Sequence, residues 1–201
     1  RVIPKADTDK FQAAGTIDIT GEKHYVYIGW DPHPGAKESM VGIHACTYHE
    51  GIHVIVAQDT FYSATPSDQT DALFKLVRRL MRLSVFTHAV FVLCPEANTI
   101  VHAKILEETL AGALHADIRP RVCLLYEVGS SKTRPGIVTT KAVNQCYQTR
   151  QLLMENRMRY WKHFFSNNES ISADKMKEIF VAQMINYRYE PKNPQKDRTV
   201  F

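Results

Sequence analysis

The stretch from His24 to Tyr62, HYVYIGWDPHPGAKESMVGIHACTYHEGIHVIVAQDTFY, decides the fold. Its first segment, residues 24–30, is rich in β-branched and aromatic side chains with few polar ones, which predicts a buried strand. The turn formers of residues 31–35 end that strand. Residues 40–48 and 52–62 have the composition of two further strands, and residues 49–51 between them indicate a hairpin turn. We therefore expect three sequential strands, in which two antiparallel partners follow the first.

Helical and strand patterns alternate after this meander. A capping residue and a proline at residues 65–68 open a helix that ends near residue 84, and further helices are predicted at residues 99–114, 140–156 and 172–186. Apolar runs at residues 88–94 and 122–128 predict two more strands. This order favours an α/β fold with a mixed β-sheet flanked by helices. We expect residues 1–201 to form a single domain, a fragment of a longer protein, in which residues 1–21 contribute a linker or a short leading strand.

Two carboxylates stand at the ends of predicted strands. Asp31 closes the first strand, and Glu96 lies two residues past the apolar run of residues 88–94. If those strands are neighbours, both carboxylates emerge at the same edge of the sheet. Hard divalent cations prefer oxygen ligands, and phosphodiester hydrolysis by two metal ions about 3.5–4 Å apart needs a carboxylate that bridges them. Acids at these positions describe a ribonuclease H-like scaffold, so Asp31 and Glu96 are predicted to bind two Mg²⁺ or Mn²⁺ ions and to be catalytic.

Three short stretches resemble the C-terminal nuclease domain of the large terminase subunit of tailed phages and herpes-type viruses. Residues 25–32, YVYIGWDP, look like the first catalytic strand of the family, and Asp31 matches its metal-binding aspartate. Residues 92–98, VLCPEAN, look like the second, and Glu96 matches its catalytic glutamate. Residues 134–141, RPGIVTTK, with the helix and short segment of residues 150–165 that follow, are similar to the stretch that runs beside DNA. The resemblance covers most of the chain from residue 25 onward.

The family completes its metal site with a third acidic residue after a final strand. Residues 198–201 look like the start of that strand, and no acid follows within the sequence. The resemblance therefore implies a third ligand beyond Phe201. Asp59 is the local alternative because its strand is predicted beside the first, and His33, two residues past Asp31, is a candidate contact to substrate or water.

One basic segment carries more net positive charge than the whole chain. Residues 132–163 hold seven Lys and Arg against one acidic residue, a net charge of +6, whereas the whole chain is +4. Such a segment suits a polyanion, although a solvated basic face has the same composition. We predict that Lys132, Arg134, Lys141 and Arg150 contact DNA phosphates, which carry no sequence information.

These observations predict a two-metal-ion endodeoxyribonuclease that, by resemblance, cuts concatemeric viral DNA during genome packaging. Double-stranded DNA is the expected partner, and the resemblance adds other terminase subunits and the portal. It also implies a location in the host nucleus for a herpes-type virus or in the host cytoplasm for a phage. Two alternatives remain open: another ribonuclease H-like enzyme such as a transposase, integrase or resolvase, and a non-catalytic DNA-binding or scaffold domain.

Composition excludes other classes of protein. The sequence is 44% hydrophobic and 23% charged, which excludes a disordered or low-complexity chain, and its apolar runs are too short to span a membrane. The four cysteines stand singly, without the paired spacing of a zinc ribbon or a disulfide framework. Cys46, Cys94 and Cys123 are expected as small core residues. His49 and His53, four residues apart across a hairpin turn, are not expected to bind zinc as a pair.

Overall fold

Three consecutive strands form the centre of the sheet, as the sequence predicts. The computed structural model describes residues 3–32, 40–62, 65–95, 100–125, 142–186, 190–191 and 199–200. The three strands are β2 (Tyr25–Asp31), β3 (Met40–His49) and β4 (Ile52–Tyr62), and β3 pairs antiparallel with both β2 and β4. The hairpin between β3 and β4 turns at Glu50 and Gly51, whose φ angles are 51° and 77°. Two positive φ angles are typical of the tight turn that matches the twist of paired strands, and glycine adopts one of them without strain.

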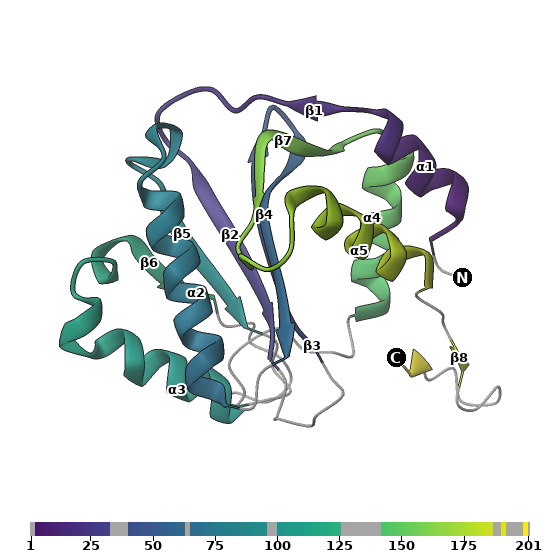
Figure 1. The fold of residues 1–201 in the computed structure, drawn as a ribbon. Helices are drawn as coiled ribbons and strands as arrows, with labels where there is room; N and C mark the ends of the chain where they lie inside the picture. Colours follow the sequence, from purple (N-terminus) through teal and green to yellow (C-terminus); the bar gives the residue numbers. More distant parts are fainter. Residues whose placement is uncertain are drawn as a thin grey trace.

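Four further strands extend this meander into a seven-stranded mixed sheet with the order β1-β7-β4-β3-β2-β5-β6 (Figure 1). On one side β5 (Val90–Pro95) pairs parallel with β2, and β6 (Val122–Leu124) pairs parallel with β5. On the other side β7 (Met158–Ser166) pairs parallel with β4, and β1 (Thr16–Ile17) pairs parallel with β7. The expected α/β class with a mixed sheet is thus confirmed.

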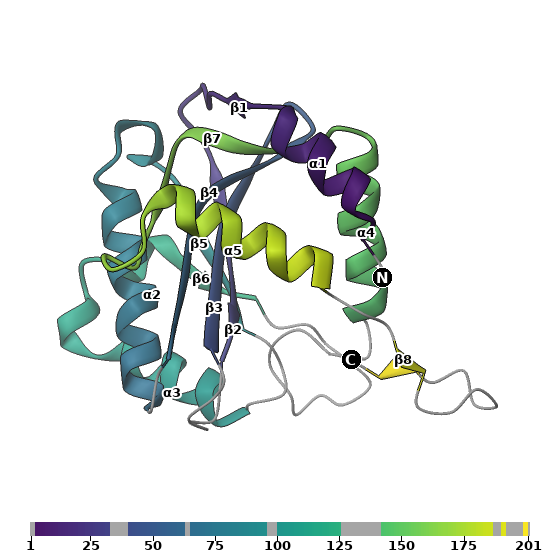
Figure 2. The same cartoon turned by 45° about the vertical axis from the view of Figure 1, so that its right-hand side comes forward.

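Helices cover both faces of the sheet. On one face lie α2 (Pro66–Met81), which is capped by Thr65, and α3 (Ile100–Ala111). On the other lie α1 (Lys5–Ala13), α4 (Ala142–Met154) and α5 (Ala173–Asn186) (Figures 1 and 2). Each face has its own core of buried apolar side chains, one built around α2 and the other around α5. None of the helices in the described part of the chain is long and apolar enough to cross a membrane.

The termini of the chain differ from the sequence expectation. Residues 5–13, expected within a linker or short strand, form α1, whose Phe11 is buried against Tyr160. The short leading strand is present as β1, after the helix. Two short strands, β8 (Glu190–Pro191) and β9 (Thr199–Val200), pair antiparallel near the other end of the chain.

Of the helix and short segment expected over residues 150–165, the helix is present as the end of α4, and the short segment that follows it is strand β7. Its aromatic residues serve both cores: Trp161 is buried on the α2 face, whereas Tyr160 and Phe164 are buried on the α5 face. Burial of alternate side chains on two faces is what a strand provides and a one-sided helix does not. The basic residues interspersed between these aromatics conceal the strand pattern in the sequence. Smaller differences are the three-residue 3₁₀ helices η1 (Ser84–Phe86), η2 (Ala113–His115) and η3 (Arg119–Arg121), and β6, which is shorter than predicted.

Candidate active site

The two strands that lead to the predicted acids are neighbours. β2 and β5 run parallel with Trp30 opposite Pro95, so both strands end at the same edge of the sheet. Asp31 is the last residue of β2 and pairs with Gly42 of β3. Glu96 follows Pro95 directly in the sequence and lies outside the described residues. The adjacency on which the predicted carboxylate pair depends is therefore confirmed for the strands.

Asp31 has the surroundings of a cation ligand. Its side chain is exposed, and it forms no hydrogen bond or ion pair with the residues that the structure describes. Along β2 the residues Val26, Ile28 and Trp30 are buried on the α2 face, so Asp31 lies on the opposite face, toward α5. Gly42 beside it leaves space, because a β-carbon at that position would lie 4.0 Å from the Asp31 Cβ. The carboxylate is thus free to bind an ion that prefers oxygen ligands.

A cavity of about 550 Å³ opens beside Asp31, between the sheet and α5. Gly29, Asp31, Gly42 and His44 contribute to it from the sheet, and α5 contributes mainly apolar side chains: Met176, Ile179, Phe180, Gln183 and Met184. A concave, largely apolar site with a few polar groups at one end is the usual form of a ligand-binding site.

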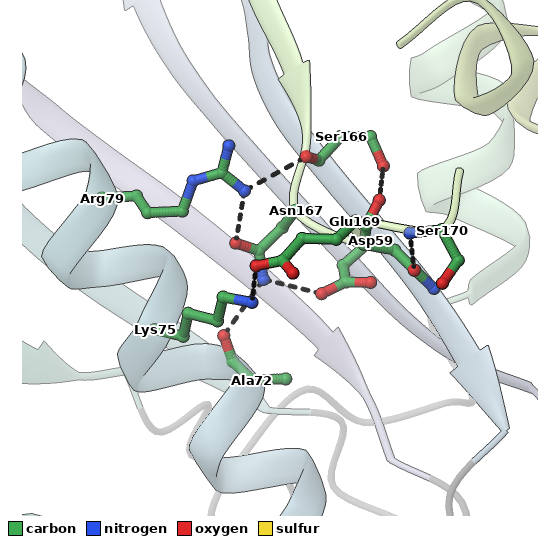
Figure 3. Close-up of polar contacts among 9 residues, drawn as sticks. Asp59, Ala72, Lys75, Arg79, Ser166, Asn167, Glu169 and Ser170 are labelled. Atoms are coloured by element: carbon green, nitrogen blue, oxygen red, sulfur yellow. Dashed lines mark hydrogen bonds and ion pairs between the residues drawn. The ribbon is translucent and has the colours of Figure 1, made fainter. Parts of the chain in front are cut away.

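Asp59, the local alternative for a third metal ligand, lies on the other face of the sheet from Asp31. It is paired with Ile43, which is buried in the α2-side core, and it is among the residues that line the cavity. The Oδ2 atom of Asp59 accepts a 2.7 Å hydrogen bond from the side chain of Asn167, whose own carbonyl oxygen accepts one from Arg79 (Figure 3). Burial raises the pKa of the Asp59 carboxyl above its ordinary value, although the bond from Asn167 opposes this. These contacts assign Asp59 a structural position in the core.

The predicted DNA-contacting residues are described only in part. Lys132, Arg134, Lys141 and the candidate His33 lie outside the described residues. Arg150 is on α4, and its Nε lies 3.3 Å from the Oδ2 atom of Asp7 on α1. In the folded chain this ion pair joins two helices of the α5 face, so the charge of Arg150 is already balanced.

Sequence reasoning missed a cluster of His44, His53 and Cys46. The Nε2 atoms of the two histidines are 3.2 Å apart, and the Nδ1 atom of His44 lies 2.9 Å from the side-chain amide nitrogen of Gln58. Burial lowers the pKa of His44 to about 3 and that of His53 to about 4, so both rings are neutral at neutral pH. His49 and His53, which the sequence analysis did not expect to bind zinc as a pair, lie on opposite faces, because His49 pairs with Ile52 and His53 pairs with Tyr48. His44 and Cys46 lie on the same face of β3 as Tyr48, so they are the neighbours of His53 instead.

The cysteine expectation is confirmed in part. Cys46 and Cys94 are buried, but Cys123 is exposed because it lies on the outermost strand, β6, of the sheet.

Comparison with known proteins rests on the fold. No family model matches the sequence, and no curated protein does. Among solved structures, the human cytomegalovirus terminase nuclease domain aligns over 92% of this chain and 88% of its own, with a TM-score of 0.63 and 16% identity. The manganese-soaked form of that domain aligns with a TM-score of 0.65 at 12% identity, over 92% of this chain and 87% of its own. The chain has the fold of a terminase nuclease domain.

The large terminase of a thermophilic bacteriophage has the same terminase nuclease fold in part of its length. It aligns with 96% of this chain at a TM-score of 0.54 and 11% identity, and the aligned part is 39% of the phage protein. The seven-stranded mixed sheet flanked by helices is thus the ribonuclease H-like architecture expected from the sequence.

Proposed function

We propose that this chain is the metal-dependent endonuclease domain of a terminase large subunit and that it cuts concatemeric viral DNA during genome packaging. The observation that carries the proposal is the end of β2 beside the end of β5. Asp31 lies at that edge without a hydrogen bond or ion pair to the described residues, and Glu96 is next in sequence after Pro95. The terminase nuclease fold supports it. A manganese soak of one structural neighbour is consistent with a divalent cation.

The proposed roles follow from the chemistry of the side chains. Asp31 and Glu96 hold the cations through carboxylate oxygens, which Mg²⁺ and Mn²⁺ prefer. A pair of such ions supplies an activated water and stabilises the leaving oxygen of the phosphodiester. Lys132, Arg134 and Lys141 neutralise backbone phosphates, so the choice of cutting site depends little on base sequence. Arg150 belongs to this set by sequence, and its ion pair with Asp7 limits what it adds.

The third carboxylate remains a prediction. Asp59 lies across the sheet from Asp31 and is bonded to Asn167, so it does not complete the site on the face toward α5. From the resemblance we propose that the third acid follows Phe201. With two carboxylates alone, little negative charge offsets the repulsion between two divalent ions. We therefore expect this chain to cut DNA poorly and a chain that continues through the next strand to cut well.

Nicking of supercoiled plasmid in Mn²⁺ tests the proposal, with this chain and a longer one compared side by side. Asp31→Asn and Glu96→Gln each abolish nicking by the longer chain and leave its circular dichroism spectrum unchanged. Glu107→Gln, which removes an exposed carboxylate on α3, is the matched control and keeps full activity. Undiminished nicking by Asp31→Asn contradicts the site, and DNA binding without nicking by the longer chain supports the scaffold alternative instead. The same proposal includes the expected partners, which are double-stranded DNA, other terminase subunits and the portal. It also includes the expected location, which is the host nucleus for a herpes-type virus or the host cytoplasm for a phage.

A further inference from the structure

Three potential metal ligands converge on the α5 face of the sheet, around the β3–β4 hairpin. His44 and Cys46 come from β3 and His53 from β4. One ligand atom of each residue lies within 4.8 Å of the other two, and Cys46 is buried. The imidazole rings of His44 and His53 stack at an interplanar angle of 28°. Residues from two neighbouring strands thus present two nitrogens and a sulfur to one point.

The spacing of these atoms suits a tetrahedral ion. Two nitrogens at zinc–nitrogen distances of about 2.0–2.1 Å in tetrahedral geometry are about 3.3 Å apart. The Nε2 atoms of His44 and His53 are separated by 3.2 Å. A nitrogen and a thiolate sulfur on the same ion are about 3.6 Å apart. The Cys46 sulfur lies within 4.8 Å of a ring nitrogen of each histidine, so a side-chain shift of about 1 Å brings it to that distance.

The polar groups that surround the cluster are incompletely paired. The Nδ1 atom of His53 and the Oε1 atom of Gln58 are buried and have no hydrogen-bond partner among the described residues. Unpaired buried polar atoms call for an explanation such as a bound water or ion. Gln58 also faces the outer nitrogen of His44 at 2.9 Å. When the amide presents its oxygen there, that nitrogen carries the proton, and the Nε2 lone pair is directed toward His53.

We propose that His44, His53 and Cys46 bind one Zn²⁺ ion, with Gln58 orienting His44 and the fourth coordination position open to the cavity. Both histidines line that cavity, so water or a small anion can reach the ion there. Three protein ligands with one exchangeable position form the usual catalytic zinc arrangement, in contrast to the closed four-ligand structural site.

This zinc site is distinct from the edge at which Asp31 lies. His44 is opposite Gly29 in the pairing of β2 and β3, whereas Asp31 is opposite Gly42, two residues further along. Two residues of strand correspond to about 7 Å. Nitrogen and sulfur ligands select Zn²⁺, whereas a carboxylate edge selects Mg²⁺ or Mn²⁺. The two sites therefore differ in position and in the ion they prefer.

Titration of the metal-free protein with Zn²⁺, and separately with Co²⁺ as a spectroscopic substitute, tests the proposal. We expect one Zn²⁺ per chain, retained in millimolar Mg²⁺, and a Co²⁺ spectrum with the charge-transfer band of a cobalt–thiolate bond. Cys46→Ser removes that band, and His44→Gln or His53→Gln weakens Zn²⁺ binding by at least about 100-fold. Gln58→Leu weakens it about 10-fold or more, as is typical when a partner of a ligating histidine is removed.

The matched controls are the exposed residues His88 and Cys123. His88→Gln and Cys123→Ser keep the affinity and the spectrum, and Asp31→Asn keeps the Zn²⁺ affinity because it belongs to the other site. A wild-type Co²⁺ spectrum without a thiolate band overturns the proposal, even if a cluster variant fails to fold. So does a Zn²⁺ affinity that Cys123→Ser abolishes or that His44→Gln leaves unchanged. Because none of these measurements involves DNA cleavage, the result is independent of the proposed nuclease function.

Discussion

Asn167, directly after β7, donates a 2.7 Å hydrogen bond to the Oδ2 atom of Asp59 on β4 and a 3.3 Å bond to the carbonyl oxygen of Ala72 on α2. One buried amide thus joins two strands and a helix. Its oxygen accepts a 3.3 Å bond from Arg79, so both ends of the amide are paired. The contact explains how a carboxyl group is accommodated in the α2-side core.

Replacing Asn167 by Ala is therefore expected to destabilise the protein by about 1–3 kcal/mol, because the buried Asp59 carboxyl loses its side-chain partner. Urea unfolding measures the free energy. Glu169→Gln is the control, since it alters only the exposed ion pair with Lys75 in the same region and is expected to leave stability unchanged. Equal effects of the two substitutions would contradict the buried role of Asn167.

The raised pKa of Asp59 predicts a pH dependence of its own. Just above its ordinary value of 3.8 the carboxyl releases its proton more readily in the unfolded chain than in the folded one. The folded state then binds more protons, so this group's contribution to stability falls as pH rises through that window. Asp59→Asn removes the effect. Urea unfolding between pH 4 and pH 6 is expected to give a variant whose stability rises more steeply with pH than that of the wild type.

The lowered pKa values of His44 and His53 act in the opposite direction. Below the ordinary value of 6.5 the unfolded chain takes up protons that the buried rings do not. Stability is therefore lost as pH falls from about 6.5 toward the folded values of about 4 and 3, by roughly 1 kcal/mol per pH unit for each histidine. Unfolding in EDTA measures this without bound metal. The double variant with Asn at both positions is expected to show a weaker dependence of unfolding free energy on pH. The exposed control His88→Asn is expected to keep the wild-type dependence.

Gly42 is expected to control access to Asp31. A β-carbon at this position makes ordinary contact, 4.0 Å from the Asp31 Cβ, so in the longer chain Gly42→Ala folds and nicks plasmid within about 3-fold of the unsubstituted longer chain. Gly42→Leu places a branched side chain against the carboxylate and is expected to lower nicking at least 10-fold. Thermal melting verifies that both variants fold. Full activity of Gly42→Leu would show that the face of the sheet beside Asp31 is not where DNA is cut.

The basic segment predicts a change in the salt dependence of DNA binding. Replacing Lys132, Arg134 and Lys141 together by Ala flattens the slope of log affinity against log salt by about one unit for each phosphate that the protein no longer neutralises. The affinity falls by a similar factor on duplexes of unrelated sequence. Arg150→Ala is expected to change the slope less, because Asp7 already balances this charge. An unchanged slope in the triple variant would return the segment to a solvated basic face.

Local sequence patterns were sufficient to predict much of the fold and the strand end at which Asp31 lies. The runs of residues 25–31, 40–49 and 52–62 are strands because their β-branched and aromatic side chains suit a half-buried pleated surface, and the turn residues between them set the order. Asp31 is the last residue of such a run, and the turn-forming residues that follow it predict where the strand ends. The parallel pairing of β2 with β5 then follows from the alternation of strands and helices.

Tertiary structure decided which side chains share a face. Asp59 is on a strand of the same sheet as Asp31, yet strand parity and the irregular pairing of β4 turn it to the opposite face, and a shift of one residue reverses every side chain. Strand alternation brings His53 to His44 rather than to His49, because His53 pairs with Tyr48 and His49 pairs with Ile52. Strand β7 forms because the cores on both faces of the sheet need its aromatic residues. Parity, bulges and long-range burial depend on contacts between segments far apart in sequence, so no local pattern records them.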